Sequence, residues 1–333
     1  MLAKAGAWLD RAAFKPATLP DDLVTVLALT PCVVAGLVIF RLSAVRMLAI
    51  ALAIGTLGLI ASYIVLRNQV PRRAASSLIA AVFGVALVGA GASLVVSIEV
   101  ALLAVVLELL RARYMPAIRA QAGLIAFAAV ALATRGAPFS YINPSGKTFG
   151  DAIDPIDTWF RFFHQSSWTL DPIKLYVGDV SGPVFATSLL AVAVGVAWLA
   201  YARRVSLSVL FAFLVGALVS IYTLRWDVLF QLDSGPTWFV AGLLLADRRL
   251  LPDSWSIRPT LGFAAGLFAI GLRHNGYGVQ AAYFIVAAIQ AAMAVLVIVI
   301  WAASVLRERW KRTRRLRQRE ANLRVVKTIS RAS

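Results

Sequence analysis

Long apolar runs recur along almost the whole chain, and they restrict the possible folds more than any other feature. Several reach the roughly 20 residues that an α-helix needs to cross a bilayer, and the last run ends only at residue 305. Only 15% of the 333 residues are charged, against about 25% in soluble domains. A signal peptide would explain one run near the N-terminus and no others. The sequence therefore predicts an all-α integral membrane protein.

We expect about ten transmembrane helices, with ends accurate to a few residues. The predicted spans are 23–41, 43–66, 76–94, 97–110, 118–134, 184–202, 206–223, 236–246, 259–272 and 277–305. The fourth, eighth and ninth are short, so we expect tilted, broken or re-entrant segments, which persist in a bilayer only where protein or a cavity covers the backbone. The last span is long enough for its end to project from the membrane as a helix.

Basic residues are distributed unevenly between the connections. If the N-terminus lies inside, the inner connections hold 25 of the 33 Lys and Arg residues. This asymmetry is what the positive-inside rule predicts. We therefore expect a multi-pass protein of the cell inner membrane with both termini in the cytoplasm.

The net charge of +17 comes largely from the C-terminal tail, because residues 307–331 carry eleven bases and two acids. A basic segment that follows a final span typically binds anionic lipid headgroups and fixes topology. A docking site for a cytoplasmic partner is the alternative for this tail, whereas nucleic-acid binding is not expected.

One connection is much longer than the others, at residues 135–183. A loop of this length usually has a function, and its aromatic residues either stack on a planar ring or form a helix in the membrane interface. The segment around Lys147 and Thr148 superficially resembles a phosphate-binding loop, but Tyr141 occupies the place of the first glycine and no strand precedes it. Nucleotide hydrolysis is therefore excluded.

Few side chains in the sequence can carry redox or metal chemistry. Cys32 is the single cysteine, so there is no intrachain disulfide and no cysteine-ligated metal cluster, and we expect Cys32 to be a small core residue. Two acids lie in apolar sequence, where ionisable groups are functional candidates. Glu99 is the candidate for an ion or proton path. Glu108, which is close to Arg111 and Arg113, is more simply part of an interfacial ion pair. The turn at Asp247 predicts a cytoplasmic anchor.

The order of features resembles the NqrB/RnfD family of membrane subunits, which occur in the sodium-pumping NADH:quinone oxidoreductase and in the Rnf electron-transport complex. The resemblance covers the first apolar span, the turn RARYMPAIRA, the segment FATSLLAVAVGVAWLAYARRVSLSV and the last two loops. The matching residues are Pro116, Ala117, Thr187, Ser188, Gly195, Arg203, Asp247, Pro252, Arg273, Gly276 and Tyr277. Met115, Phe185 and Ala186 differ from the family pattern, so the chain resembles a divergent member.

The resemblance implies a covalent FMN. In that family a Ser-Gly-Ala-Thr motif before the sixth span carries FMN as a phosphoester on the Thr hydroxyl. The corresponding residues here are Ser145, Gly146 and Thr148, with Lys147 in place of the Ala and Ile142 in place of an acidic residue. The alternative is an ordinary polar turn. The family would also suggest a second, non-covalent flavin between spans.

The family fold consists of two inverted five-helix repeats, which fits the division of this chain. We expect a cytoplasmic segment at 1–22, membrane repeats at 23–134 and 184–305, an outer loop at 135–183 and a basic tail at 306–333. The resemblance implies a flavin-binding subunit of an electron-transport complex, with other membrane and peripheral subunits as partners and possible coupling to Na⁺ or H⁺ movement. The alternatives are a small-solute transporter or channel on the same fold, and a non-catalytic membrane anchor of a redox complex.

Overall fold

The computed structural model describes residues 19–65, 76–142, 144, 172–226, 228–275 and 278–332. Among these residues every regular element is a helix, and extended pairing is limited to isolated bridges between Gly89 and Pro183 and between Val205 and Asp247. Three helical segments are long and apolar enough to cross a membrane, namely Asp21–Ile64, Leu207–Leu224 and Gln280–Glu308. The prediction of an all-α membrane protein is confirmed at this level, and the count of ten spans stays a prediction.

In sequence order the helices fall into two groups, one before and one after the long loop. The first group is α2 (Asp21–Val65), α3 (Ser76–Ala86), α4 (Leu94–Tyr114), α5 (Ala122–Ala133) and the short η2 (Ala137–Phe139). The second is α7 (Pro172–Val177), α8 (Leu189–Tyr201), α9 (Leu207–Leu224), α10 (Val228–Leu232), α11 (Gly235–Trp238), η3 (Phe239–Leu245), α12 (Ile257–Gly271), η4 (Leu272–Asn275) and α13 (Gln280–Ala332). The element η3 is a π-helix that continues α11.

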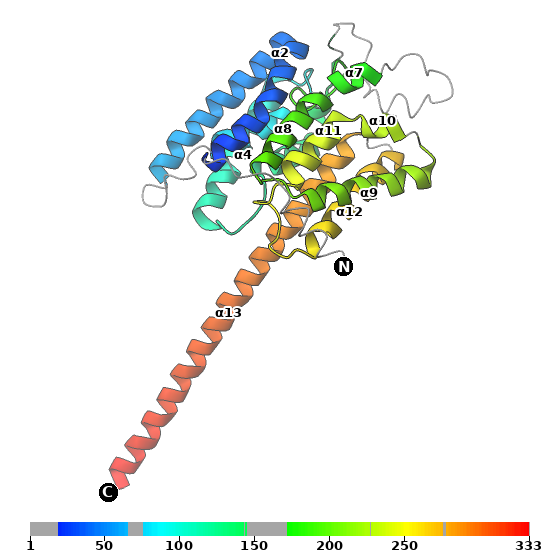
Figure 1. Cartoon of the computed structure of the whole chain (residues 1–333). Coiled ribbons are helices and arrows are strands. Elements are labelled where there is room, and N and C mark those ends of the chain that lie inside the picture. The colour runs from blue at the N-terminus through cyan, green and yellow to red at the C-terminus, as the bar shows by residue number, and fades with distance from the viewer. Residues whose placement is uncertain are drawn as a thin grey trace.

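The helix α2 consists of two arms that fold back on each other. Arg41 has φ 47° and ψ −116°, which interrupts the helix between residues 21–40 and 42–65. The arms run in opposite directions (Figure 1), and Val33 of the first faces the same apolar groove as Leu48 of the second. The break falls where the sequence predicts the boundary between the first two spans.

The sequence predicts one irregular segment and misses two others. The eighth predicted span is short and broken as expected, since it consists of α11 and the π-helix η3 and ends at Leu245. The third span is expected to reach residue 94, but α3 ends at Ala86 and non-helical backbone follows. The sixth is expected from residue 184, but α8 begins at Leu189. The fourth, which we expected to be short, is the 21-residue helix α4. Chain length alone misplaces these breaks, because the backbone of the two interrupted segments is paired with other segments rather than within a helix.

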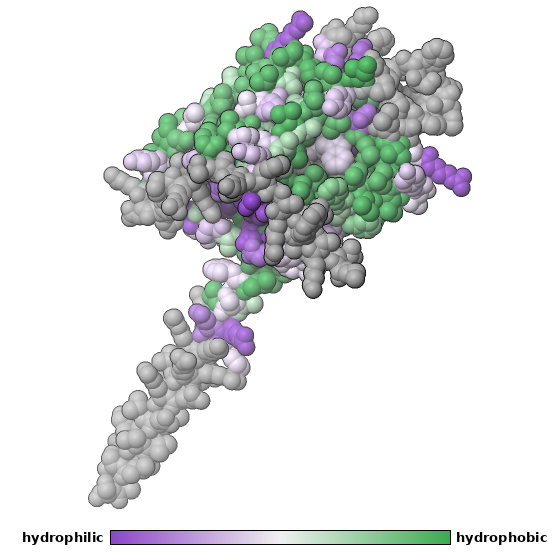
Figure 2. Space-filling model, viewed as in Figure 1, coloured by the Kyte–Doolittle hydropathy of each residue, from purple (hydrophilic) through white to green (hydrophobic). Residues whose placement is uncertain are grey.

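The two ends of the bundle differ, and we name them by what lies there. The tail end is where α2 begins at Asp21 and where α13 leaves the bundle, continuing as a helix to Ala332 as the sequence predicts (Figure 1). The loop end is where the described chain stops at Pro144 and resumes at α7. Between the ends, hydrophobic residues cover most of the visible face of the bundle (Figure 2). Such a surface suits a bilayer rather than water.

Aromatic contacts join the two groups of helices in the core. The rings of Phe83 on α3 and Phe239 on η3 lie 6.0 Å apart, and those of Phe127 on α5 and Tyr283 on α13 lie 5.7 Å apart. Both pairs are edge-to-face, the arrangement that the ring quadrupole favours. Cys32 is buried in the same core, as the sequence predicts.

Candidate functional site

The predicted flavin-attachment residues, Ser145, Gly146 and Thr148, lie outside the described residues. The same holds for the aromatic residues in the middle of this loop, namely Trp159, Phe160, Phe162, Phe163 and Trp168. The segments that flank this loop are described and lie at the loop end. On one side, the side chain of Ile142 packs close to Gly91. On the other, Leu175 of α7 packs against Val279, which follows η4. The loop therefore begins and ends at the same end of the bundle.

Three stretches of chain, most of whose backbone lies outside helices, meet at the loop end, and we call them the loop-end junction: residues 86–91, 138–142 and 183–187. The amide of Gly89 donates to the carbonyl of Pro138 at 2.9 Å, and the amide of Val184 donates to the carbonyl of Val88 at 2.9 Å. Val88 and Val184 are fully buried. Non-helical backbone is tolerated at membrane depth when its polar groups are paired inside the protein, and these bonds provide that pairing.

A buried arginine lies beside the junction. Arg273 on η4 is 3% exposed and donates to the side-chain oxygen of Gln231 at 2.8 Å, to Ser234 Oγ at 3.3 Å and to Thr237 Oγ1. The adjoining cavity, lined in part by Thr187, is only about 10 Å³, which is room for at most one water molecule. In this conformation the cluster holds a positive charge close to the loop but has no space for a flavin ring.

A second polar cluster lies at the tail end, centred on the carboxylate of Asp247. It accepts from Arg204 Nη2 at 2.8 Å and from the backbone amide and Nη2 of Arg249, each at 3.0 Å. Both arginines also donate to Thr25 Oγ1, and Arg204 donates to the carbonyl of Asp21. Burial raises the pKa of Asp247, but the positive charges of Arg249 and Arg204 outweigh it and hold the pKa below its ordinary value. The predicted turn anchor is confirmed for Asp247 and Arg249, and its cytoplasmic side stays a prediction.

Further bonds connect the two groups of helices at the tail end. Arg119, which precedes α5, donates to the carbonyl of Leu251 at 2.7 Å and to the carboxylate of Asp253 at 2.6 Å. The hydrogen bond from Arg119 is the main cause that lowers the pKa of Asp253. The side chain of Gln290 on α13 accepts from the amide of Gln121 and donates to the carbonyl of Leu244. The two groups are thus bonded at the tail end as well as at the loop-end junction.

The two acids of the fourth predicted span, Glu99 and Glu108, have different surroundings. Glu99 is exposed on the surface of α4, so it does not face the interior of the bundle where an ion path would run. Glu108 is 4% exposed and accepts from Nη2 and Nε of Arg111 at 2.5 and 2.9 Å. The predicted ion pair of Glu108 is confirmed.

A comparison of the chain with protein-family models and with curated proteins finds no match.

The residues that the structure adds to the candidate site are Arg204, Thr25, Gln231 and Gln290. Gln290 could have been found from the sequence, because it stands alone within the long apolar run of the last span, where polar residues are rare. Arg204 could not, since its partner Asp247 is 43 residues away.

Proposed function

We propose that this chain is a flavin-binding membrane subunit of an electron-transport complex. The proposal extends the resemblance to the NqrB/RnfD family of the sodium-pumping NADH:quinone oxidoreductase and the Rnf complex. The observation that carries it is the bonding between the two groups of helices at both ends of the bundle. A redox subunit has to hold its cofactor in a fixed position and electrostatic setting, and a bundle tied at both ends suits that role.

The same proposal includes ten spans in two inverted five-helix repeats. Two features support it. Arg41 follows the first apolar arm of α2 and Arg203 follows α8, and both have a left-handed backbone, with φ of 47° and 56°. The first arm of α2 also runs antiparallel to α8, since Gly36 lies against Val184, which precedes α8, and Gly195 of α8 lies against Ala28. Equivalent elements of opposite direction are what inverted repeats require.

In this proposal Thr148 carries FMN as a phosphoester, and Ser145 and Gly146 complete the attachment motif. FMN, when bound, would supply one-electron chemistry. The protein would hold the two ends of the loop in place at the loop end, where Leu175 packs against Val279. Arg273 would supply a positive charge nearby. The proposal places the protein in the cell inner membrane, with the loop end on the outer side and both termini in the cytoplasm. The proposal also includes coupling of electron transfer to Na⁺ or H⁺ movement, a second, non-covalent flavin, and other subunits as partners.

A small-solute transporter is the second candidate, favoured by one observation. Buried non-helical backbone, as at Val88 and Val184, is also typical of transporters that bind substrate at broken helices. Transport by rocking would have to break bonds at one end of the bundle in each cycle. If the protein binds no flavin but carries a solute into proteoliposomes, the transporter is favoured. If it neither binds flavin nor transports a solute, a non-catalytic anchor is favoured.

The decisive experiment is co-expression with a flavin transferase, followed by ultraviolet fluorescence of the protein band on a denaturing gel. Covalent FMN at Thr148 predicts a fluorescent band that Thr148→Ala abolishes. Thr158→Ala, in the same loop, is the matched control and should remain fluorescent. A dark wild-type band, or equal fluorescence in Thr148→Ala, would refute attachment at Thr148. Flavin absorbance of the native protein then separates a loosely bound flavin from none.

A further inference from the structure

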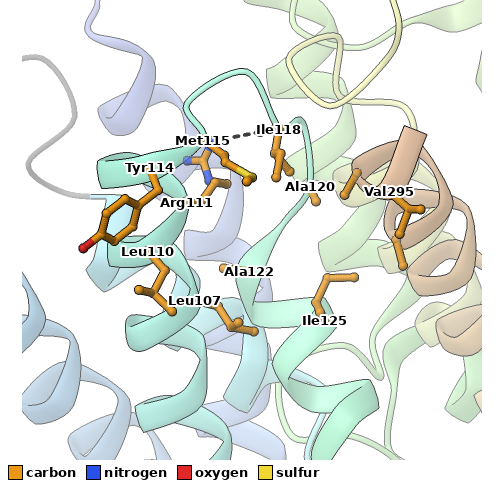
Figure 3. Close-up of a pocket in the computed structure, with 12 residues that line it drawn as sticks. Leu107, Leu110, Arg111, Tyr114, Met115, Ile118, Ala120, Ala122, Ile125 and Val295 are labelled. Carbon is orange, nitrogen blue, oxygen red and sulfur yellow. Dashed lines mark hydrogen bonds between the residues drawn. The ribbon is translucent and has the colours of Figure 1, made fainter. Parts of the chain in front are cut away.

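A groove of about 450 Å³ lies between α4, α5 and α13 near the tail end (Figure 3). It is lined by Leu107, Leu110, Arg111, Tyr114, Met115, Ile118, Ala120, Ala122, Ile125, Ala291, Ala294 and Val295. Almost all of these side chains are apolar. The groove lies on the apolar side of the bundle, where Leu110 and Val295 are exposed. Its natural surroundings are therefore lipid chains rather than water.

The groove has a polar upper end. The connection between α4 and α5 arches over it, and Arg111 donates to the carbonyl of Ile118 at 3.1 Å across that arch (Figure 3). Leu107 and Ile125 line its deeper, apolar part (Figure 3). Tyr114, at the polar end, is 72% exposed, and tyrosine is enriched where hydrocarbon gives way to headgroups. The cavity thus runs from the headgroup level into the hydrocarbon layer.

The charges at the polar end favour an anion. Arg111 has five N–H donors, of which two bond to Glu108 and one to Ile118 within the described part of the chain. Two donors of this half-buried guanidinium are left for a further acceptor. Arg113 lies two residues along α4, and α13, which forms one wall of the groove, continues into the tail with its eleven bases and two acids.

We propose that the groove binds one anionic phospholipid, with an acyl chain between α4, α5 and α13 and the phosphate beside Arg111. An amphiphile matches both parts of the cavity, because its chain fills the apolar part and its phosphate accepts from the guanidinium. Basic pockets between membrane helices on the cytoplasmic side are a known mode of lipid recognition. The binding is independent of the flavin and of Thr148.

The first test fills the apolar part of the groove. The purified chain in detergent is mixed with phosphatidylglycerol or phosphatidylcholine, and retained lipid is counted by native mass spectrometry. We expect one phosphatidylglycerol per wild-type chain. Ala291 is exposed and lines the groove, whereas its exposed neighbour Ala292 does not. Ala291→Phe should weaken retention at least about tenfold, because each buried CH₂ contributes a factor of roughly four, and Ala292→Phe should leave it unchanged.

The second test removes the charge that selects the headgroup. The double variant Glu108→Gln/Arg111→Gln replaces the ion pair without leaving a buried charge, and it should reduce the preference for phosphatidylglycerol about fivefold or more. Equal retention in wild type and Ala291→Phe, with both chains monodisperse, would overturn the site. Equal retention of the two lipids by wild type would overturn the role of Arg111. If a co-purified partner helix crosslinks to Val295 and displaces the lipid, the groove is a protein interface and the proposal fails.

Discussion

The contact between α9 and α12 gives the sharpest test of the structure, because glycines bring the two backbones together. Gly216 on α9 and Gly262 and Gly266 on α12 all face backbone atoms of the other helix. A Cβ atom on Gly266 would lie 2.0 Å from the carbonyl oxygen of Phe213 and 2.9 Å from the amide nitrogen of Ala217. Small residues at such crossings allow the close packing that holds membrane helices together.

The variant Gly266→Ala adds that Cβ. Ordinary contact begins at 3.4 Å, so the oxygen of Phe213 is about 1.4 Å too close and the helices must separate by a comparable distance. Overpacking usually costs about 1–3 kcal/mol of stability. We expect a cost at the upper end of this range, because the clash is with backbone and no side chain can rotate away to relieve it. The better helix propensity of Ala returns about 1 kcal/mol. We therefore expect Gly266→Ala to lower the free energy of unfolding by about 2 kcal/mol.

Gly271→Ala on the same helix is the control, because its Cβ would meet only Ser220 Oγ, at 3.9 Å. Gly271 is the last residue of α12, so its propensity gain is smaller than in the helix interior. Because there is no clash, this variant should be as stable as wild type or slightly more stable. Both variants would be compared with wild type by unfolding titrations in mixed detergent micelles, followed by tryptophan fluorescence. If Gly266→Ala matches Gly271→Ala, the two backbones do not approach as closely as the structure has them, and the reasoning fails.

Other predictions concern charge. Asp247→Ala leaves Arg204 and Arg249 without their shared carboxylate and should lower the free energy of unfolding by about 3–5 kcal/mol in the same titration; a loss well under 1 kcal/mol would contradict this. Since the folded-state pKa of Asp247 is lowered, its stabilisation is complete above its unfolded pKa of about 3.9 and is lost as pH falls through the folded value. The stability gap between wild type and Asp247→Asn should therefore narrow only in that acidic range, and a gap that narrows at neutral pH would point to another group. Asp253→Asn should leave the unfolding midpoint unchanged, because its carboxylate is exposed. Removal of residues 307–333 should weaken sedimentation with vesicles of phosphatidylglycerol, and the loss should be smaller in high salt; equal sedimentation would argue for a protein partner of the tail.

The helical class, the break at Arg41 and the projecting end of α13 could be predicted from the sequence, since each depends on local properties. Apolar run length determines whether a segment is a membrane helix. The end of α3 at Ala86 could not be predicted in this way. The residues after it, Leu87 and Val88, are as apolar as those before it, and their backbone is non-helical because it pairs with residues near Val184, almost a hundred positions away.

The polar sites likewise differ in whether local sequence or tertiary structure determines them. Glu108 and Arg111 are three residues apart on one helix, so their ion pair follows from helical spacing. Glu99 occupies a comparable apolar setting in the sequence, but it lies on the exposed side of α4. Hydropathy does not determine which side of a uniformly apolar helix faces the protein. The tail-end cluster of Arg204 and Asp247 likewise depends on tertiary structure, so only half of it could be anticipated.

The bonds at the two ends bear directly on the choice between a fixed redox subunit and a moving carrier. At the tail end they include the bonds from the buried Arg204 to Thr25 Oγ1 and to the carbonyl of Asp21, and leaving the donors of a buried guanidinium unpaired is costly. At the loop-end junction they include the backbone bonds from Val184 to Val88 and from Phe185 to Ala86, and opening them would expose unpaired amide groups at membrane depth. A carrier that works by rocking opens the two ends alternately. It therefore needs contacts at each end that water can replace at a low cost in free energy. Since both ends here use buried partners, the arrangement supports the proposed rigid subunit over a rocking carrier.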